Sequence, residues 1–246
     1  MAPAANGSTG PVTDNNVVFL AVAFCPEPPL LHPEALGTDG QDVGAALRAA
    51  CSDALGRVLA VEPEAIVVLG AGPDDGAYGP GDAGDLLGYG VPVRVGFDGP
   101  PTIGAARLPL AHTLGAWLLD EAGFSGQRVG LSAGTTSPRL RTARADDRRS
   151  ALLVMGDGSA RRTEKSPGWF SPDAIIFDET VTAALASGDG KALLDLDVTL
   201  GEQVLAAGLR SWQTAGEILA GVPMIGQVHY AQAPCGVFYV VASWVR

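Results

Sequence analysis

Short runs of apolar residues alternate with longer segments of helical periodicity along this chain. Strands are predicted over residues 17–24, 65–69, 91–97, 128–131, 151–155, 224–231 and 237–244. Helices are predicted over residues 42–61, 103–122 and 172–186, and over 192–219 as two helices with a break. The first, second and fifth strands are apolar throughout, which is typical of strands that are buried on both faces of a sheet.

Punctuating residues divide these elements. Gly123 and Gly188 follow predicted helices as C-terminal stops, and Ser171 stands at a good N-cap position. Residues 76–90 are rich in glycine and are expected to form an irregular loop. The last two strands are separated by a short segment with Pro and Gly, which favours an antiparallel pair. Together the pattern predicts an α/β fold, a mixed central sheet with helices on both faces.

Composition adds limits on domain organisation, location and partners. Residues 1–15 are small and polar and are expected to be a disordered tail, followed by a single domain over 16–246. A net charge of −11 argues against a nucleic-acid partner, and the basic residues at 139, 141, 144, 148 and 149 are interrupted by two aspartates. The apolar run 17–25 is too short for a membrane span. Three unpatterned cysteines indicate neither a disulfide framework nor a zinc site, so the expected location is the cytoplasm.

The densest group of charged residues beside a buried strand lies in residues 150–165. Ligands of open α/β sheets bind past the carboxyl ends of the strands, so Asp157, Ser159 and Arg161 are candidate binding residues. An aspartate in a tight Gly-x-Gly turn is more often a backbone-capping residue, and this structural role is the favoured interpretation of Asp157. Ser159, Arg161 and Arg162 could hold an anion.

A second candidate is the segment Gly130-Leu131-Ser132-Ala133-Gly134, which matches the nucleophile elbow G-x-S-x-G. His229 lies downstream, so Ser132 and His229 could belong to a hydrolase triad. The segment after residue 134 is a poor start for the helix that an elbow requires. The histidines His32, His112 and His229 show no metal-binding spacing, although His32 and His229 both lie near proposed strand ends.

Three segments resemble the class III extradiol ring-cleavage dioxygenases, in the chain of those enzymes that carries the iron site. They are residues 24–31 (FCPEPPLL), 155–160 (MGDGSA) and 233–239 (APCGVFY). The resemblance implies a mixed α/β fold with a site at the strand ends. It also implies a non-haem Fe(II) held by two His and one Glu, with a further His as acid/base.

The sequence departs from that family at the positions of the chemistry. Glu27 stands where the first His is expected, Gly70-Ala71-Gly72 where the second is expected, and Ala160 where the acid/base His would lie. Glycine and alanine side chains neither ligate a metal nor transfer a proton. We therefore expect no cofactor, no catalytic residue of the family, and a former active-site cleft that binds a small molecule or a partner. Its expected lining is Glu27, His32, Ala71, Asp157, Ser159, Ala160 and Arg161.

Two other functions stay open. One is an active Fe- or Zn-dependent oxidoreductase or hydrolase with an altered ligand set, through Glu27 with His32 or His229, or a serine hydrolase through Ser132. The other is a structural role as a homo-oligomer.

Overall fold

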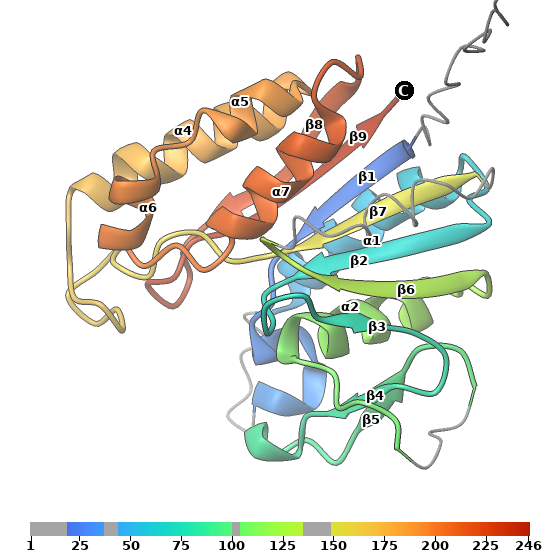
Figure 1. Ribbon diagram of the computed structural model, residues 1–246. Coiled ribbons are helices and arrows are strands. Elements are labelled where there is room, and N and C mark those ends of the chain that lie inside the picture. Colours follow the sequence, from blue (N-terminus) through green and yellow to red (C-terminus); the bar gives the residue numbers. More distant parts are fainter. Residues whose placement is uncertain (1–18, 37–43, 100–103, 135–148) are drawn as a thin grey trace, which may run out of the picture.

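A seven-stranded mixed sheet forms the centre of the molecule (Figure 1). The computed structural model describes residues 19–36, 44–99, 104–134 and 149–246. The predicted tail and most of the basic cluster lie outside these residues. The strands of the sheet are β1 (Phe19–Cys25), β2 (Ala65–Gly70), β3 (Ala77–Tyr78), β6 (Gln127–Ser132), β7 (Ser150–Met155), β8 (Ile225–Gln232) and β9 (Tyr239–Val245). Their order is β3-β6-β2-β7-β1-β9-β8.

The four central strands are parallel, and the edges are antiparallel. β1 pairs in parallel with β7, and β2 pairs in parallel with both β7 and β6. β9 runs antiparallel to β1 and to β8, so the predicted antiparallel pair at the end of the chain is confirmed. Every residue of β2 and β7 is buried. Their unbroken apolar sequences therefore reflect a layer of helices on each face of the sheet.

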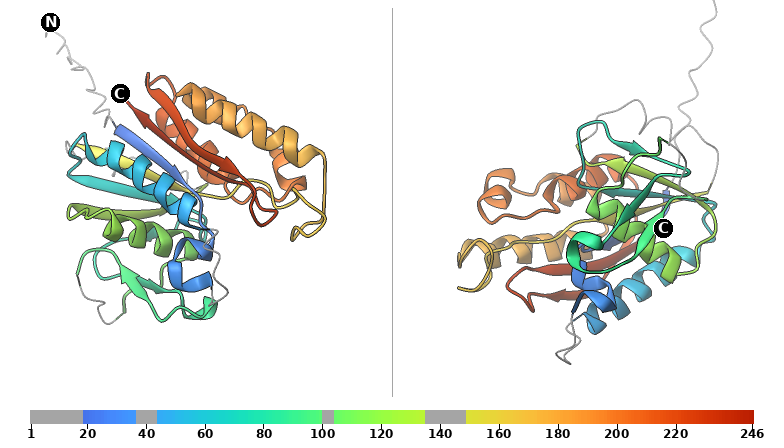
Figure 2. Two further views of the ribbon diagram at one scale, coloured as in Figure 1. Left: turned by 180° about the vertical axis from the view of Figure 1, so that it is seen from behind. Right: turned by 90° about the horizontal axis from the view of Figure 1, so that it is seen from below.

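Helices cover both faces, as the pattern predicted. The helices are α1 (Ala45–Leu59), α2 (Leu110–Glu121), α4 (Asp173–Ser187), α5 (Gly190–Leu194), α6 (Val198–Gln203) and α7 (Leu209–Leu219). α1 and α2 cover one face and lie in front of the sheet in the left view of Figure 2. The helices α4 to α7 cover the other face. The fold class predicted from the sequence is thus confirmed. Among the described residues, no helix is both long and apolar enough to cross a membrane.

The predicted helix 103–122 is wrong over its first part, because α2 begins only at Leu110. Pro109 lies at the N-cap position and cannot be placed inside a helix without losing a hydrogen bond. Residues 106–108 are instead extended beside Ala83, with backbone hydrogen bonds between Ala83 and Ala106 and between Leu108 and Ala83. The pairing with a distant residue overrides the local apolar periodicity.

Residues 76–90, predicted as an irregular loop, contain ordered elements. β3 pairs with β6, and β4 (Ala83–Asp85) pairs with β5 (Arg94–Gly96) in a separate two-stranded sheet. A short 3-10 helix, η3, spans Leu87–Tyr89. Strands of two or three residues are defined by their partners, so a glycine-rich sequence gives little sign of them.

The segment 192–219 forms three helices where two were predicted. Asp189 and Asp197 cap the first two by accepting hydrogen bonds from the backbone of Lys191 and Leu200. Ser171 does not cap α4; the N-cap position is Pro172, which has no side-chain cap. Gly188 ends α4 in the left-handed conformation with φ 71°, as predicted.

We predict that Gly156→Ala lowers the free energy of unfolding by more than about 2 kcal/mol, because a Cβ atom there would collide with the Cα atom of Gly208. Gly56→Ala is the matched control. Gly56 is exposed inside α1 with nothing within 4 Å of its Cβ position, so alanine should stabilise by about 1 kcal/mol. Urea unfolding of both variants measures the difference; equal effects would contradict the close packing at Gly156.

Candidate functional site

The carboxyl ends of β1 and β7 create a crevice at the centre of the sheet. The chain leaves β1 toward α1 on one face, and leaves β7 toward α4 on the other face (Figure 1). Neighbouring parallel strands whose connections diverge in this way form a topological switch point, the usual place for a ligand in an open α/β sheet. The residues that follow the two strands therefore form the candidate site.

Glu27 and Asp157 lie together at this crevice. Each stands two residues beyond its strand, and Cys25 pairs with Met155 at the strand ends. The backbone N–H of Gly156 donates to the carbonyl of Cys25 at 3.0 Å, and the backbone N–H of Glu27 donates to Oδ1 of Asp157 at 2.8 Å. Asp157 thus holds the loop after β1 against the loop after β7. This is the backbone-capping role that the sequence favoured, and it brings two carboxyl groups together.

Burial makes both carboxyl groups hard to ionise. Burial, with a smaller contribution from the neighbouring Asp157, raises the pKa of Glu27 from 4.5 to about 8. Burial likewise raises the pKa of Asp157 from 3.8 to about 7, although the hydrogen bond from the backbone of Glu27 favours its charged form. Oε2 of Glu27 is buried and has no hydrogen-bond partner among the described residues, whereas Asp157 is partly exposed. The pair can therefore hold a proton near neutral pH, and one of its oxygens lacks the partner that burial normally requires.

Tyr239 is a third polar group at this site, and sequence reasoning did not single it out. Burial, followed by the nearby charge of Asp157, raises the pKa of Tyr239 well above its usual range. Tyr239 begins β9, which runs antiparallel to β1, so its position beside the crevice depends on strand order. No local motif marks it.

The other predicted lining residues lie in varied surroundings. Ala71 follows β2 at the same edge and is exposed. The His32 ring packs on Trp117 of α2 with ring centroids 5.2 Å apart, and its Nδ1 accepts a hydrogen bond from the backbone of Glu34. Among the described residues, no hydrogen bond joins His32 to Glu27 or Asp157.

Ser159, Ala160 and Arg161 are bonded to the surrounding fold. Ser159 is fully buried, and its Oγ donates to Oδ2 of Asp178 at 2.6 Å. The backbone N–H of Ala160 donates to the carbonyl of Val204. The guanidinium group of Arg161 donates to backbone carbonyls of the loops near α6 and α4, those of Gln203 and Trp169. These bonds place the three residues in the connection from β7 to α4 rather than against the carboxyl pair.

Arg162 completes a buried network around Asp178. Its guanidinium group lies 3.2 Å from Oδ2 of Asp178 and 5.3 Å from the centre of the Phe238 ring. Burial raises the pKa of Asp178, while the hydrogen bonds from Ser159 and the charge of Arg162 act in the opposite direction. Arg162 and Ser159 therefore stabilise a buried carboxyl group of α4, and the anion site considered for them has no support in their contacts.

The triad suggested by the G-x-S-x-G segment is contradicted by the sheet order. Ser132 ends β6 and His229 lies in β8, five strands away, which is roughly 24 Å at the usual spacing of strands. Nε2 of His229 instead lies 2.8 Å from Oγ of Ser243. Ser132 is fully buried and its Oγ has no partner among the described residues. These two residues cannot act together.

His112 is a buried structural residue, as expected for a histidine inside a helix. Nε2 of His112 donates to the carbonyl of Leu131 at 3.0 Å, and its ring lies 4.7 Å from that of Tyr78. Burial lowers the pKa of His112 to about 4, so the ring is neutral at physiological pH.

The two-histidine, one-carboxylate iron site implied by the resemblance does not fit these residues. Glu27 and Asp157 supply only carboxylate oxygens, and Ala71 and Ala160 have no ligand atoms. A side chain at Gly70 would collide with α2, because its Cβ atom would lie 2.5 Å from that of Ala111. Within the described ranges, no three His, Cys, Asp or Glu side chains converge to hold a metal ion.

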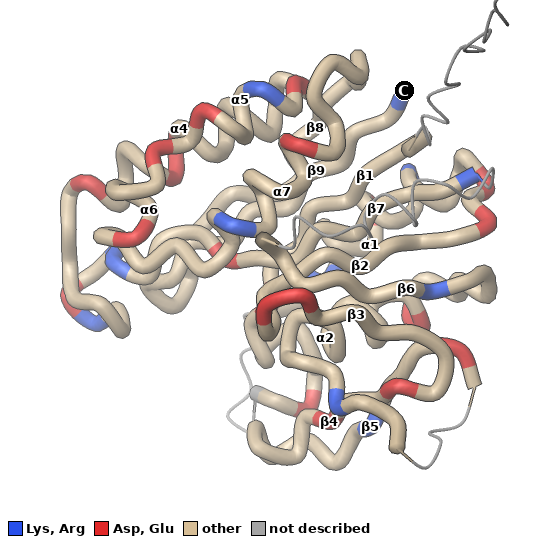
Figure 3. Tube along the Cα trace, in the orientation of Figure 1, with Lys and Arg blue, Asp and Glu red and all other residues tan. Residues whose placement is uncertain are grey.

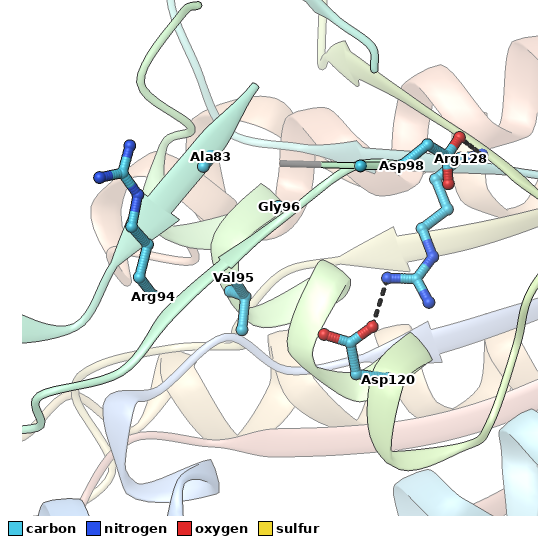
Figure 4. A pocket seen from close by; sticks show the side chains of 8 residues that line it. Ala83, Arg94, Val95, Gly96, Asp98, Asp120 and Arg128 are labelled. Atoms are coloured by element: carbon cyan, nitrogen blue, oxygen red, sulfur yellow. Dashed lines mark hydrogen bonds and ion pairs between the residues drawn. The ribbon is translucent and has the colours of Figure 1, made fainter. Parts of the chain in front are cut away.

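A cavity of about 430 Å³ lies at the opposite end of the sheet (Figure 4). It is lined by Ala83, Arg94, Val95, Gly96, Asp98, Gly99, Asp120 and Arg128. Arg128 points to Asp120 at 2.5 Å and also donates to the carbonyl of Phe124, whereas Arg94 lies on the other wall and points away from this pair. The guanidinium group of Arg128 is thus used within the fold.

Comparison with known proteins extends to the fold. No family model and no curated protein matches this chain. A crystal structure of an uncharacterised protein from Escherichia coli K12 matches 92% of this chain and 100% of its own, with a TM-score of 0.54 and 15% sequence identity. The two chains share an α/β fold. The likeness carries no function.

We predict that Ser159→Ala destabilises the protein by about 1 to 3 kcal/mol, because the buried carboxyl group of Asp178 loses a hydroxyl donor. The control is Thr180→Ala on the exposed side of α4, which should change stability by less than about 0.5 kcal/mol. Denaturant unfolding gives both values. Equal small effects would mean that Ser159 is not needed by the fold and is free to serve a ligand.

We also predict that stability falls as the pH rises through 7 and 8. The raised pKa values of Glu27 and Asp157 mean that the folded chain holds protons that the unfolded chain has released above about pH 4.5. The stabilisation by the protonated pair is complete below that pH and is lost as the pH passes 8. Glu27→Gln should therefore stabilise by about 1 to 3 kcal/mol at pH 8.5 and by much less at pH 5.

Thermal unfolding of wild type and Glu27→Gln from pH 4.5 to 9 measures this difference. Glu34→Gln, in the same loop but exposed, is the control and should follow wild type at every pH. A constant difference between wild type and Glu27→Gln across the range would show that Glu27 ionises normally.

Proposed function

We propose that this chain binds a small polar molecule at the crevice between β1 and β7 and does not carry out metal-dependent ring cleavage. The observation that carries the proposal is the buried carboxyl oxygen of Glu27 that has no hydrogen-bond partner among the described residues, beside the partly exposed Asp157. A buried polar atom without a partner costs free energy, and a ligand that supplies the missing hydrogen bond removes that cost.

The carboxyl pair limits the chemistry of the ligand. With pKa values near 7 and 8, the pair carries at least one proton at physiological pH and can donate as well as accept a hydrogen bond. A hydroxyl or amide group, which also does both, is the natural complement. A ligand dominated by negative charge would meet the acidic pair and is disfavoured.

The proposed loss of ring cleavage follows from the missing imidazoles. The family chemistry requires two neutral nitrogen ligands and a histidine acid/base, and the corresponding positions hold Glu27, residues 70–72 and Ala160. The clash of any side chain at Gly70 with Ala111 also restricts how a ligand could be restored there.

A metal-dependent enzyme with an altered ligand set is the second candidate. The observation in its favour is the pair of adjacent carboxyl groups, which offer the oxygen ligands that hard divalent cations prefer. Such a cation would favour the ionised forms of both groups and would reverse their tendency to hold protons.

The proposal is tested by thermal shift with a panel of catechols, polyols and small amides, using wild type, Glu27→Ala and the control Glu34→Ala. A true ligand at 100 times its dissociation constant stabilises the folded state by about 2.7 kcal/mol. We expect hits with wild type and Glu34→Ala that are lost with Glu27→Ala. Hits that survive Glu27→Ala would place binding elsewhere.

Metal content separates the two candidates. Elemental analysis after exposure to Fe(II), Mn(II) and Zn(II) should find less than stoichiometric metal if the first proposal holds. One equivalent of metal that is lost in Glu27→Ala would favour the metal-dependent enzyme, and a catechol-cleavage assay on the loaded protein would follow.

A further inference from the structure

The strand β8 is an open edge of the central sheet. It is the last strand in the order and pairs only with β9. Among the described residues, every backbone hydrogen bond of 225–232 runs to β9. Several of its side chains are exposed, and Ile225 is 70% exposed. One side of this eight-residue strand therefore offers unpaired donors and acceptors.

The two edges of the sheet differ in how they are protected. The opposite edge, β3, has only two residues and follows Asp74 and Asp75, so it is short and acidic. β8 has neither proline nor a charged residue, and no Lys, Arg, Asp or Glu occurs from Ile218 to Val245. Figure 3 shows β8 and β9 without acidic or basic residues. Natural proteins usually blunt exposed edges with charges, prolines or very short strands. β8 lacks all three of these devices.

The charge distribution identifies the occupant. Two copies of a chain with net charge −11 repel each other over most of their surfaces. The uncharged edge is where this repulsion is weakest, and an antiparallel strand can pair with its own copy about a two-fold axis. We infer that β8 pairs with β8 of a second copy of this chain, so that two seven-stranded sheets form one continuous sheet.

The helices beside β8 leave this edge open for pairing. α1 contacts β8 on one face, where Arg57 donates to Oε1 of Gln227, and α4 packs on the other face at Gly226. Both contacts are made through side chains or the face of the strand, and not by backbone pairing along its outer side. A bulge between Val228 and Tyr230 shifts the register with β9, so the pairing between copies divides into two short stretches on either side of it.

The test is the solution mass across a concentration series from about 1 to 200 µM, by light scattering coupled to size exclusion. Wild type should show twice the 25.1 kDa mass of one chain. The edge variant Ile225→Lys with Ala231→Lys adds two charges to exposed positions of β8 and should return the mass to one chain.

A matched control makes the same kind of change elsewhere. Leu87→Lys with Tyr89→Lys replaces two exposed apolar side chains of η3, far from β8, and should leave the two-chain mass unchanged. Circular dichroism and thermal unfolding check that each variant folds.

Hydrogen–deuterium exchange gives a second measurement that needs no variant. Amides of residues 225–232 should become more protected as the wild-type concentration rises, while those of β3 should not change. A wild-type protein that stays at one-chain mass throughout would overturn the inference. A two-chain mass that survives the edge variant would also overturn it.

Discussion

The parallel pairing of β1 with β7 is the constraint on which the rest of this molecule depends. These two strands lie side by side although 124 residues separate the end of β1 from the start of β7. The backbone hydrogen bond from Gly156 to Cys25 and the contact of Glu27 with Asp157 extend the pairing beyond the strand ends. Because the connections after the two strands go to opposite faces, the crevice, the carboxyl pair and the two layers of helices all follow from this one pairing.

The same pairing explains why the carboxyl groups have unusual proton affinities. The central strands are covered on both faces, so polar side chains just past their ends are withdrawn from water. Asp157 gains a backbone donor from this arrangement, while Glu27 gains no partner for its buried oxygen among the described residues. A site in which one group serves the fold and its neighbour is left unsatisfied is a natural place for a ligand.

Close approach of helices to the sheet also limits what the site can contain. Gly70 and Gly156 lie against Ala111 and Gly208, and neither position leaves room for a side chain. The network of Ser159, Arg162 and Asp178 is likewise used to hold α4 to the connection after β7. The free polar chemistry of this edge is therefore concentrated on Glu27, Asp157 and Tyr239.

The sequence by itself determined the alternation of strands and helices, the burial of the central strands and the antiparallel pair at the end. These features follow from local periodicity and composition, because a buried strand or an amphipathic helix must carry its apolar residues in a fixed pattern. It also placed Glu27 and Asp157 just after strands. Only the tertiary structure decided that the two carboxyls meet and that Tyr239 lies beside them, because those distances depend on strand order. It likewise decided that Ser132 and His229 lie five strands apart, and that residues 106–108 are extended beside β4. Contacts between residues distant in the chain depend on non-local pairing, which no local pattern encodes.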